Sequence, residues 1–399
     1  MTAPKTARGD RAVQLLVVGA GPVGLLAGLV AARRGVAVEI IDQTFRGFGR
    51  GHASLLHPST VRLLDELGLG TKVREQGREL FSVRIRAAGE QPVDLRLPSP
   101  AVSLGQSALE DILLGALRAE GAAVHAPVEA STIQQDAHGV RVTVVRKELV
   151  TLGSPGDYSE WEPIDSATIT ADFVIGADGY ASKVRSALGV DSVTLGAVRG
   201  FAMFDVARGT GSDSVELGFA DGLGSMALPL PGEKARYGFQ LESGLDVEPD
   251  AIRLHDLIEM QAPWLQDGVR QVDWSTVVHF ERRLARRFGA GRVWLAGDAA
   301  HVTSPFGAQS INLGLSEASD LVERVVDCIQ GAADVEALAR YGDERQREWH
   351  KLLGVHVRYD LLPHAPPWLG KVAREVAPAL PASGADLTKL CAELGLSVD

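Results

Sequence analysis

The sequence predicts an α/β fold with a Rossmann-like domain, an inserted antiparallel β-sheet domain and a helical C-terminus. Three observations lead to this fold class. Near the N-terminus, an apolar run of strand length is followed at once by a glycine-rich turn and a helix-like segment, the pattern that begins a parallel α/β sheet. Short segments of alternating polarity fill the middle of the chain and indicate antiparallel strands. The residues from about Ala385 onward are helix-like.

Length and composition exclude several classes of protein. The 399 residues are enough for two or three domains, and the 23% charged and 45% hydrophobic fractions argue against disorder. A formal net charge of −11 argues against nucleic-acid binding, because phosphate contacts need a basic face. Cys328 and Cys391 can form neither a disulfide framework nor a zinc cluster, and HExxH and CxxC motifs are missing. We therefore expect no metal site, no nucleic-acid partner and a cytoplasmic location.

One uncharged segment, residues 15–32, has the length of a membrane helix or a signal-peptide core. Glycine and proline interrupt it at 19–24, within a pattern that has another explanation. We therefore do not expect an integral membrane protein.

The glycine-rich turn GAGPVG has the surroundings of a dinucleotide-binding motif. It follows the strand-like run 13–18, precedes a helix, and is followed by a second strand at 36–41 that ends at Asp42. In such motifs the first glycine permits a tight turn, the second lets the backbone approach a pyrophosphate, and the third allows close helix–strand packing. An acid at this distance is suited to bind ribose hydroxyls, whereas a coincidental glycine-rich turn is the weaker alternative. The predicted contacts are Gly19, Gly21, Pro22, Val23, Gly24 and Asp42.

Two later strands also end in an aspartate beside a glycine. The strand at 171–176 precedes Asp178, and the strand at 292–296 precedes Gly297 and Asp298. Ligands of open α/β sheets bind at the carboxyl ends of the strands, so three such ends favour a cofactor with a ribose, a pyrophosphate and a further polyol chain. FAD has such a ribityl chain and NAD does not. For each aspartate alone, a helix N-cap or turn role is the competing explanation.

The three motifs, in this order, resemble those of the FAD-dependent aromatic hydroxylases related to para-hydroxybenzoate hydroxylase, which are single-component flavoprotein monooxygenases. They are GAGPVG at 19–24, GADGYASKVR at 176–185 and GRVWLAGDAAHVTSPFGAQSINLGLSEA at 291–318, and a glutamine-bearing helix start, QSALE, lies at 106–110. The family commonly has a Gly-Gly-Gln-Gly-like stretch where this chain has GAQSIN at 307–312. The resemblance implies further FAD contacts at Arg50 or His52, Gln106, Asp178, Gly297, Asp298, Ala308, Ser310, Ile311 and Asn312.

The resemblance also implies a reaction. NADPH or NADH reduces FAD, O2 reacts with the reduced flavin to give a C4a-hydroperoxide, and an aromatic ring activated by a phenol or amine group is hydroxylated. Pro305, Gly307 and Gln309 would lie in the flavin and oxygen environment. His301 is either a general base or, as we favour, a structural residue. Five residues could line an aromatic pocket, although no more than about half are expected to touch substrate: Phe201, Met203, Phe219, Met226 and Leu228.

Alternative functions on the same scaffold are a Baeyer–Villiger-type or other FAD oxidoreductase and a non-catalytic flavin-binding protein. A halogenase is disfavoured because the Trp-x-Trp-x-Ile-Pro segment is missing. No second GxGxxG is present, so a separate NADPH-binding domain is not expected. The partner would be a small aromatic molecule, and the chain would be a monomer or homodimer.

The order of the segments predicts discontinuous domains. Alternation predicts hairpins at 81–97 and 124–146, a helix lies between them at 106–120, and composition predicts a surface loop over 147–165. Four more strands are expected around 201–206, 215–219, 225–230 and 236–241. The predicted domains are an FAD-binding domain (1–71, 104–190 and 275–355), a substrate-binding β-sheet domain (72–103 and 191–274) and a helical C-terminal tail (356–399).

Overall fold

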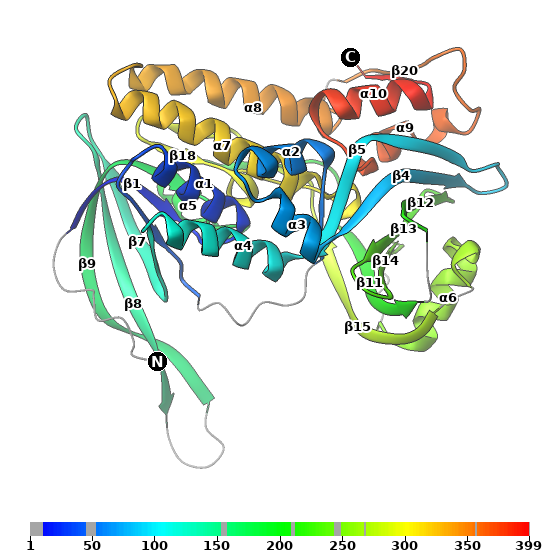
Figure 1. The fold of residues 1–399 in the computed structure, drawn as a ribbon, viewed down its shortest axis with the longest axis horizontal. Coiled ribbons are helices and arrows are strands. Elements are labelled where there is room, and N and C mark those ends of the chain that lie inside the picture. Colours follow the sequence, from blue (N-terminus) through cyan, green and yellow to red (C-terminus); the bar gives the residue numbers. More distant parts are fainter. Residues whose placement is uncertain are drawn as a thin grey trace.

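Two large β-sheets organise the chain in the computed structural model, one beside the other, with helices over both (Figure 1). The structure describes residues 11–44, 53–152, 158–208, 212–242, 249–266, 269–355 and 357–398. Arg50 and His52, two of the predicted cofactor contacts, lie outside these ranges.

The first sheet is parallel at its centre. Its strand order is β17-β18-β9-β1-β2-β6, and β8 and β7 continue from β9 as an antiparallel extension. In the register, Val18 pairs with Gly176, and Gly176 pairs with Leu295, so the three motif-bearing strands end at the same level. The strands are β1 (Arg11–Val18), β2 (Val38–Ile41), β6 (Ala123–His125), β7 (Val128–Gln135), β8 (Val140–Leu152), β9 (Tyr158–Gly176), β17 (Gly289–Ala290) and β18 (Val293–Leu295).

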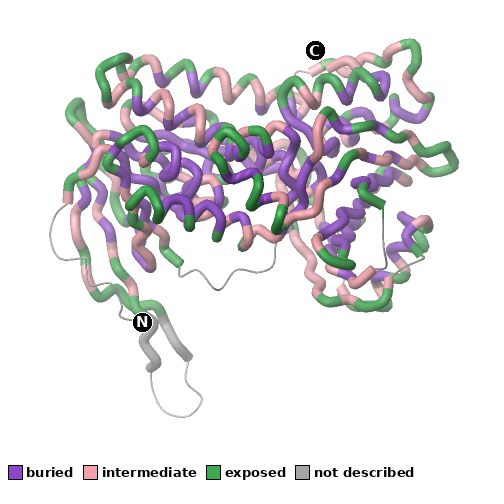
Figure 2. The backbone as a smooth tube through the Cα atoms, in the orientation of Figure 1, coloured by how far each residue is buried: buried purple, intermediate pink, exposed green. Residues whose placement is uncertain are grey.

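Helices pack on the first sheet because its strands are apolar on both faces. The helix that follows the glycine-rich turn, α1, contacts both α4 and α7, and almost every one of its residues is buried (Figure 2). No helix within the described ranges is long and apolar enough to cross a membrane. The helices of this part are α1 (Pro22–Arg33), α2 (Pro58–Glu66), α3 (Gly70–Gln76), α4 (Gln106–Ala119), α5 (Lys183–Ala187), α7 (Gln309–Ile329) and α8 (Leu338–Leu352).

The second sheet is mixed rather than wholly antiparallel, which corrects the prediction. Its order is β15-β11-β14-β13-β12-β4-β5-β3, and β12 runs parallel to β4 because these neighbours come from separate segments of the chain. The predicted hairpin at 81–97 and the four later strands are confirmed. The strands are β3 (Ala53–Leu56), β4 (Arg78–Ala87), β5 (Val93–Gly105), β11 (Arg199–Arg208), β12 (Ser214–Ala220), β13 (Leu223–Leu230), β14 (Lys234–Gln240) and β15 (Val269–Phe280).

The two faces of the second sheet pack into two different hydrophobic cores. Along β11, Phe201 and Met203 face one side, whereas Ala202 and Phe204 face the other. The second side packs under α6 (Ala251–Gln261). The first side contributes to a core shared with α9 (Leu369–Ala379) and α10 (Gly384–Leu394), and it also faces the end of the first sheet where the motifs lie. The side-chain alternation of a strand therefore selects which residues can reach a ligand.

Two predicted segments are corrected by the structure. In the polar stretch 147–165, the described residues 147–152 and 158–165 belong to strands and not to a loop, because β8 and β9 pair there as a long antiparallel arm that projects from the body of the molecule (Figure 1). Paired strands satisfy their backbone hydrogen bonds without an apolar face, so composition was misleading there.

The proline-punctuated tail is also more regular than predicted. Besides α10 (Gly384–Leu394), it contains α9 (Leu369–Ala379), which holds Pro378 in its last turn, and two short paired strands, β20 (Tyr359–Leu361) and β21 (Leu396–Val398). Another small sheet joins β10 (Ser192–Thr194), β16 (Arg283–Ala285) and β19 (His301–Val302).

Candidate functional site

The three glycines of the first motif are required for different physical reasons. Gly19 has a φ of +109°, and a Cβ there would lie 2.2 Å from the carbonyl oxygen of Ala177. A Cβ on Gly24 would lie 1.9 Å from the carbonyl oxygen of Gly19. Gly21, in contrast, has a φ of −70°, and a Cβ there would meet nothing within 4 Å. Backbone geometry and packing thus explain Gly19 and Gly24, and the open space before Gly21 fits a bound pyrophosphate.

The start of α1 faces this open space without a side-chain cap. Gly21 is its N-cap residue, Pro22 follows at the first helical position, and no acidic residue occupies the first turn. The backbone N–H groups and the positive end of the helix dipole are therefore suited to an anion such as a phosphate.

Asp42 stabilises the glycine-rich turn directly. Its Oδ2 accepts a hydrogen bond from the backbone N–H of Ala20 at 2.6 Å, and its Oδ1 accepts from the backbone N–H and the hydroxyl of Thr44 at 2.8 and 2.7 Å. The carboxylate is half-buried at the end of β2. Its predicted contact with a ribose stays a prediction.

The two later aspartates differ sharply in their contacts. Asp178 accepts from Ser182 Oγ at 2.5 Å and from the backbone N–H groups of Lys183 and Val184 at 2.7 and 3.1 Å. The N-cap residue of α5 is Ser182, and Asp178 supports this helix start from the preceding turn. Burial raises the pKa of Asp178, against the effect of these hydrogen bonds. A cofactor contact of Asp178 stays a prediction.

Asp298 instead lines a cavity of about 370 Å³. It follows Gly297, whose φ of +64° turns the chain at the end of β18. Asp298 is exposed at the cavity, yet the surrounding protein keeps water from its carboxyl group and so raises its pKa. Nearby His301 lowers the pKa, and nearby Glu317 raises it. Of the two later aspartates, Asp298 is the one whose carboxylate faces space for a ligand.

A fully buried network supports the Gly297–Asp298 turn from behind. Glu317 Oε2 accepts from the backbone N–H of Gly297 at 3.1 Å and from His301 Nε2 at 2.7 Å. Glu317 Oε1 accepts from Trp349 Nε1 at 2.6 Å, and the His301 ring stacks on Trp349 at 3.7 Å between centroids. His301 is thus part of a buried structural network, which agrees with the favoured interpretation. Glu317 and Trp349 carried no signal in the sequence, because only the fold brings α7 and α8 together here.

The segment that leads into α7 forms one wall of the cavity. Gly307 and Ala308 both have positive φ angles, of 77° and 51°, so the chain turns sharply before the helix. Ala308 therefore occupies a conformation that usually favours glycine. The Gly307 carbonyl accepts a hydrogen bond from the buried His57 Nε2 at 2.6 Å. Sequence analysis did not identify His57.

Two predicted residues of this segment turn out to face elsewhere. The Gln309 amide is fully buried and donates to the carbonyl oxygens of Leu380 and Ala382, each at 3.0 Å, so it holds the C-terminal region and does not line the cavity. Asn312 is also fully buried, and it accepts from the backbone N–H of His57 at 2.7 Å. Both side chains are structural in the described contacts, and the predicted place of these residues in the flavin surroundings stays a prediction.

The cavity brings ten of the predicted site residues together. Its walls come from the end of the first sheet and from the inner face of the second sheet. The predicted cofactor and catalytic residues that line it are Gln106, Asp298, Pro305, Gly307, Ala308, Ser310 and Ile311, and the predicted substrate residues are Met203, Met226 and Leu228.

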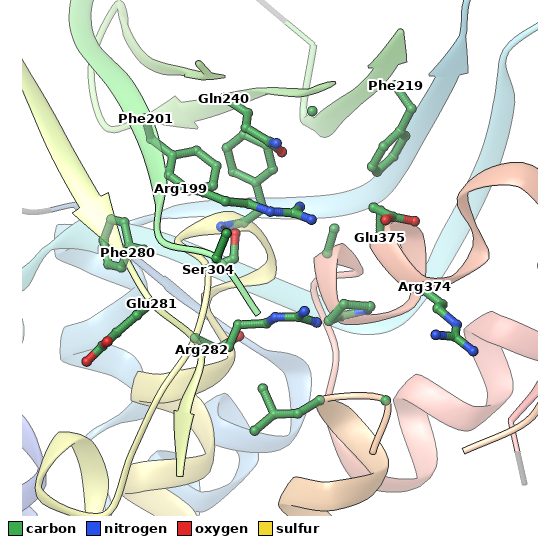
Figure 3. Close-up of a pocket in the computed structure, with 18 residues that line it drawn as sticks. Arg199, Phe201, Phe219, Gln240, Phe280, Glu281, Arg282, Ser304, Arg374 and Glu375 are labelled. Carbon is green, nitrogen blue, oxygen red and sulfur yellow. Dashed lines mark hydrogen bonds between the residues drawn. The ribbon is translucent and has the colours of Figure 1, made fainter. Parts of the chain in front are cut away.

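The two remaining substrate candidates line a neighbouring cavity. Phe201 and Phe219 border a space of about 300 Å³, which shares the lining residues Phe280, Thr303 and Ser304 with the first cavity (Figure 3). Sequence analysis did not identify Phe280, which lies at the end of β15 and borders both cavities.

These features define the class of a dinucleotide-binding α/β protein. The glycine-rich turn leaves space for a pyrophosphate, the N-terminus of α1 has no side-chain cap, and a cavity lies where three strands of the sheet end. The chain belongs to the family described as FAD binding domain, whose model matches residues 12–354. This membership confirms the resemblance noted in the sequence.

Relatives and solved structures agree with this assignment. The chain is 27% identical over 350 residues to the uncharacterized aromatic compound monooxygenase YhjG of Bacillus subtilis, covering 83% of this chain and 65% of that protein. It is 28% identical over 347 residues to 6-methylpretetramide 4-monooxygenase of Streptomyces rimosus, covering 83% of this chain and 59% of the relative. The match thus spans less than two thirds of these relatives.

The solved p-nitrophenol 4-monooxygenase PnpA from Pseudomonas putida superposes with a TM-score of 0.73 at 20% identity, covering 96% of this chain and 94% of that one. This likeness confirms the predicted fold class.

Proposed function

We propose that this chain is an FAD-dependent, NAD(P)H-consuming monooxygenase that hydroxylates a small aromatic molecule activated by a phenol or amine group. The observation that carries the proposal is the shared cavity, in which residues of the FAD motifs and apolar residues of the second sheet face the same space. The names of the aromatic monooxygenase relatives support the same reaction class.

The residues present fit FAD. The space before Gly21 accommodates a pyrophosphate, and the Asp298 carboxylate at the cavity can accept hydrogen bonds from ribityl hydroxyls. Gln106, which donates to Glu110 at 2.9 Å, borders the same cavity. When bound, FAD would supply the chemistry of hydride acceptance and oxygen activation.

The chain itself would position the substrate, place a partial positive charge beside the cavity and keep water away from the bound ring. The first turn of α7 carries no acidic residue and no side-chain cap, so its N-terminus offers a partial positive charge beside the cavity. Met203, Met226 and Leu228 are buried and make that wall apolar, which excludes water around a bound aromatic ring. Arg236 adds a cation to the wall, held by two hydrogen bonds to Asp205 at 2.6 and 2.7 Å.

A direct test begins with the purified protein. We expect it to be yellow, with one FAD per chain identified by absorbance and mass spectrometry after extraction. NADH and NADPH consumption would then be measured with a panel of phenols and aromatic amines. A product that gains one oxygen atom and keeps its aromatic ring supports the proposal.

Other outcomes favour the alternatives. Ring expansion of a ketone would indicate a Baeyer–Villiger-type reaction. Bound FAD without any substrate-dependent consumption of NADH or NADPH would indicate a flavin-binding protein without oxygenase activity. The cytoplasmic location and the monomeric or homodimeric state stay predictions.

A further inference from the structure

A separate cavity of about 160 Å³ lies where the C-terminal region packs on α7 and α8 (Figure 1). None of its lining residues borders the first cavity, and one of them, Pro378, also borders the cavity of Phe201 and Phe219. We call it the C-terminal cavity. Its apolar walls come from five elements and include Leu313 of α7, Leu352 of α8, Ala377 of α9, Leu387 of α10 and Val398 of β21.

The lining of the C-terminal cavity suits one small aromatic ring. Cys391 borders it and is buried, and this burial raises the pKa of the thiol to about 12, against the effect of Lys351. Lys351 and Thr388 are exposed, so they mark the entrance. An apolar cavity of about 150 Å³ is large enough to take up a molecule the size of benzene.

One buried polar side chain at this cavity lacks a donor. Gln309 is fully buried and borders the cavity. Its Nε2 donates to the carbonyl oxygens of Leu380 and Ala382 at 3.0 Å each and to that of Pro378 at 3.3 Å, which fixes the end of the amide that carries the nitrogen. Its Oε1 has no hydrogen-bond partner among the residues that the structure describes. Buried amide oxygens are normally paired, so this one is suited to accept a hydrogen bond from a ligand.

Two other polar side chains at the cavity have partners of their own. Ser383 Oγ lies 2.9 Å from Ser59 Oγ, within hydrogen-bond distance. Glu348 forms an ion pair with Arg345 at 2.8 Å. Neither group donates to the Gln309 oxygen in the described contacts, so a donor on the ligand is what this oxygen requires.

The C-terminal cavity lies directly behind a wall of the first cavity. Gln309 follows Gly307 and Ala308, which border the first cavity. A Cβ on Gly307 would lie 2.2 Å from the carbonyl oxygen of Pro378, so the end of α9 packs tightly against this turn. A molecule in contact with Gln309 and Pro378 would therefore touch the groups that hold the turn in place.

We propose that the C-terminal cavity is a second ligand site, for a small aromatic molecule with one hydrogen-bond donor, such as a phenol, whose hydroxyl donates to Gln309 Oε1. The inference goes beyond the proposed function and does not rest on it. A bound molecule stabilises α10 and supports the turn before α7 from behind.

The test follows hydrogen–deuterium exchange of the purified protein by mass spectrometry, without NADH or NADPH, so that no probe is consumed. Phenol and toluene are the probes, because they have nearly the same shape and only phenol has a donor. A ligand of the folded state slows local opening, so the exchange of peptides from 384–394 gives a Kd for this cavity. We expect about tenfold slower exchange at ten times the Kd, and a Kd for phenol about three- to tenfold lower than that for toluene.

Two variants should block the site. Thr388→Phe places a ring at the entrance, and Ala377→Leu fills the cavity from α9, so a blocked form remains available if one of them misfolds. Lys389→Phe is the matched control, because this neighbouring residue of α10 is exposed and does not border the cavity. Exchange without probe shows whether each variant is folded. Phenol should no longer slow exchange of 384–394 in the blocked variants and should still slow it in the control.

Three results would overturn the inference. The first is exchange of 384–394 that phenol does not slow in the wild type. The second is equal affinity for phenol and toluene, because Gln309 would then accept nothing from the ligand. The third is slowing that persists in the folded blocked variants, because the effect would then come from phenol bound in the first cavity.

Discussion

His57 Nε2 lies 2.6 Å from the carbonyl oxygen of Gly307, although 250 positions separate the two residues in the sequence. The contact joins the start of α2 to the turn before α7, at the wall of the first cavity. The imidazole must carry its proton on Nε2 to donate this bond, and the buried Nδ1 has no hydrogen-bond partner among the residues that the structure describes. Burial lowers the pKa of His57 to about 4, against the opposing effect of the Gly307 hydrogen bond.

This histidine should make stability depend on pH. The folded pKa of about 4 lies below the unfolded value of 6.5, so the unfolded chain binds a proton that the folded protein does not. The stabilisation is fully present above pH 6.5 and is lost as the pH falls toward 4, by about 3 kcal/mol from this group alone. Urea unfolding across this pH range would measure it. His57→Gln should flatten the dependence.

Gly21→Val should abolish retention of FAD while the fold remains. The Cβ has open space and the backbone is extended, so the FAD-free protein should still fold, at a cost of about 1 kcal/mol or less because valine is a poorer N-cap residue than glycine. FAD content after gel filtration and thermal unfolding would be measured together. Gly24→Ala is the contrasting variant, because its Cβ would collide with the Gly19 carbonyl and should destabilise the fold itself. A Gly21→Val protein that stays yellow would refute the pyrophosphate assignment.

Asp298→Ala should weaken FAD binding by roughly ten- to a hundredfold, because the variant loses the proposed hydrogen bond between the carboxylate and a hydroxyl group of FAD. Fluorescence titration of the FAD-free protein would report the affinity. Asp178→Ala provides the comparison, because Asp178 accepts hydrogen bonds from the first two backbone N–H groups of α5, and their loss should lower stability instead. Unchanged affinity in Asp298→Ala would leave that residue with only a role in the turn.

Ala308→Gly should stabilise the protein by about 0.5–1 kcal/mol. Ala308 has a φ of +51°, which costs a residue with a Cβ about 1–2 kcal/mol, and the greater freedom of glycine in the unfolded chain offsets part of the gain. Denaturant unfolding would measure the change. A destabilised variant would mean that packing of the Ala308 methyl group outweighs the backbone strain.

A correct substrate should accelerate the oxidation of NADH or NADPH at least about tenfold, which corresponds to 1.4 kcal/mol in the barrier. The sequence has one GxGxxG motif, which the FAD prediction already uses, so the reductant is expected to approach FAD from the protein surface. Stopped-flow absorbance at the flavin band would follow the reduction. Substrates that are hydroxylated without any change in this rate would contradict such control.

Local patterns predicted the elements that carry motifs. The strands before Gly19, Asp178 and Asp298 were found because each is a short apolar run that ends at a glycine, and the register shows that they share one sheet edge. The apolar residues Met203 and Met226 were found because strand alternation places them on one face. Each of these patterns, the apolar run before a glycine and the alternation along a strand, can be recognised within a few consecutive residues.

Other features depend on contacts that no local pattern encodes. Asn312 and Gln309 belong to the most specific motif, yet their amides bind backbone groups of α2 and of the C-terminal region. Phe201 and Phe280 pack edge-on, with 5.9 Å between ring centroids, only because β11 and β15 are neighbours in the sheet. Composition also failed for the long hairpin of β8 and β9, whose pairing relies on the backbone.

The parallel pairing of β4 with β12 has a consequence for synthesis of the chain. The β4–β5 hairpin leaves the ribosome well before β12, so one edge of β4 remains open until Ser214–Ala220 has emerged. Open strand edges invite pairing with other chains, and charged side chains protect against it. Arg84 and Arg86 lie on this strand, and in the folded protein they form ion pairs with Asp94 and with Glu216 of the arriving strand. Replacing both arginines with threonine should therefore increase aggregation during expression more than it lowers the stability of the finished protein.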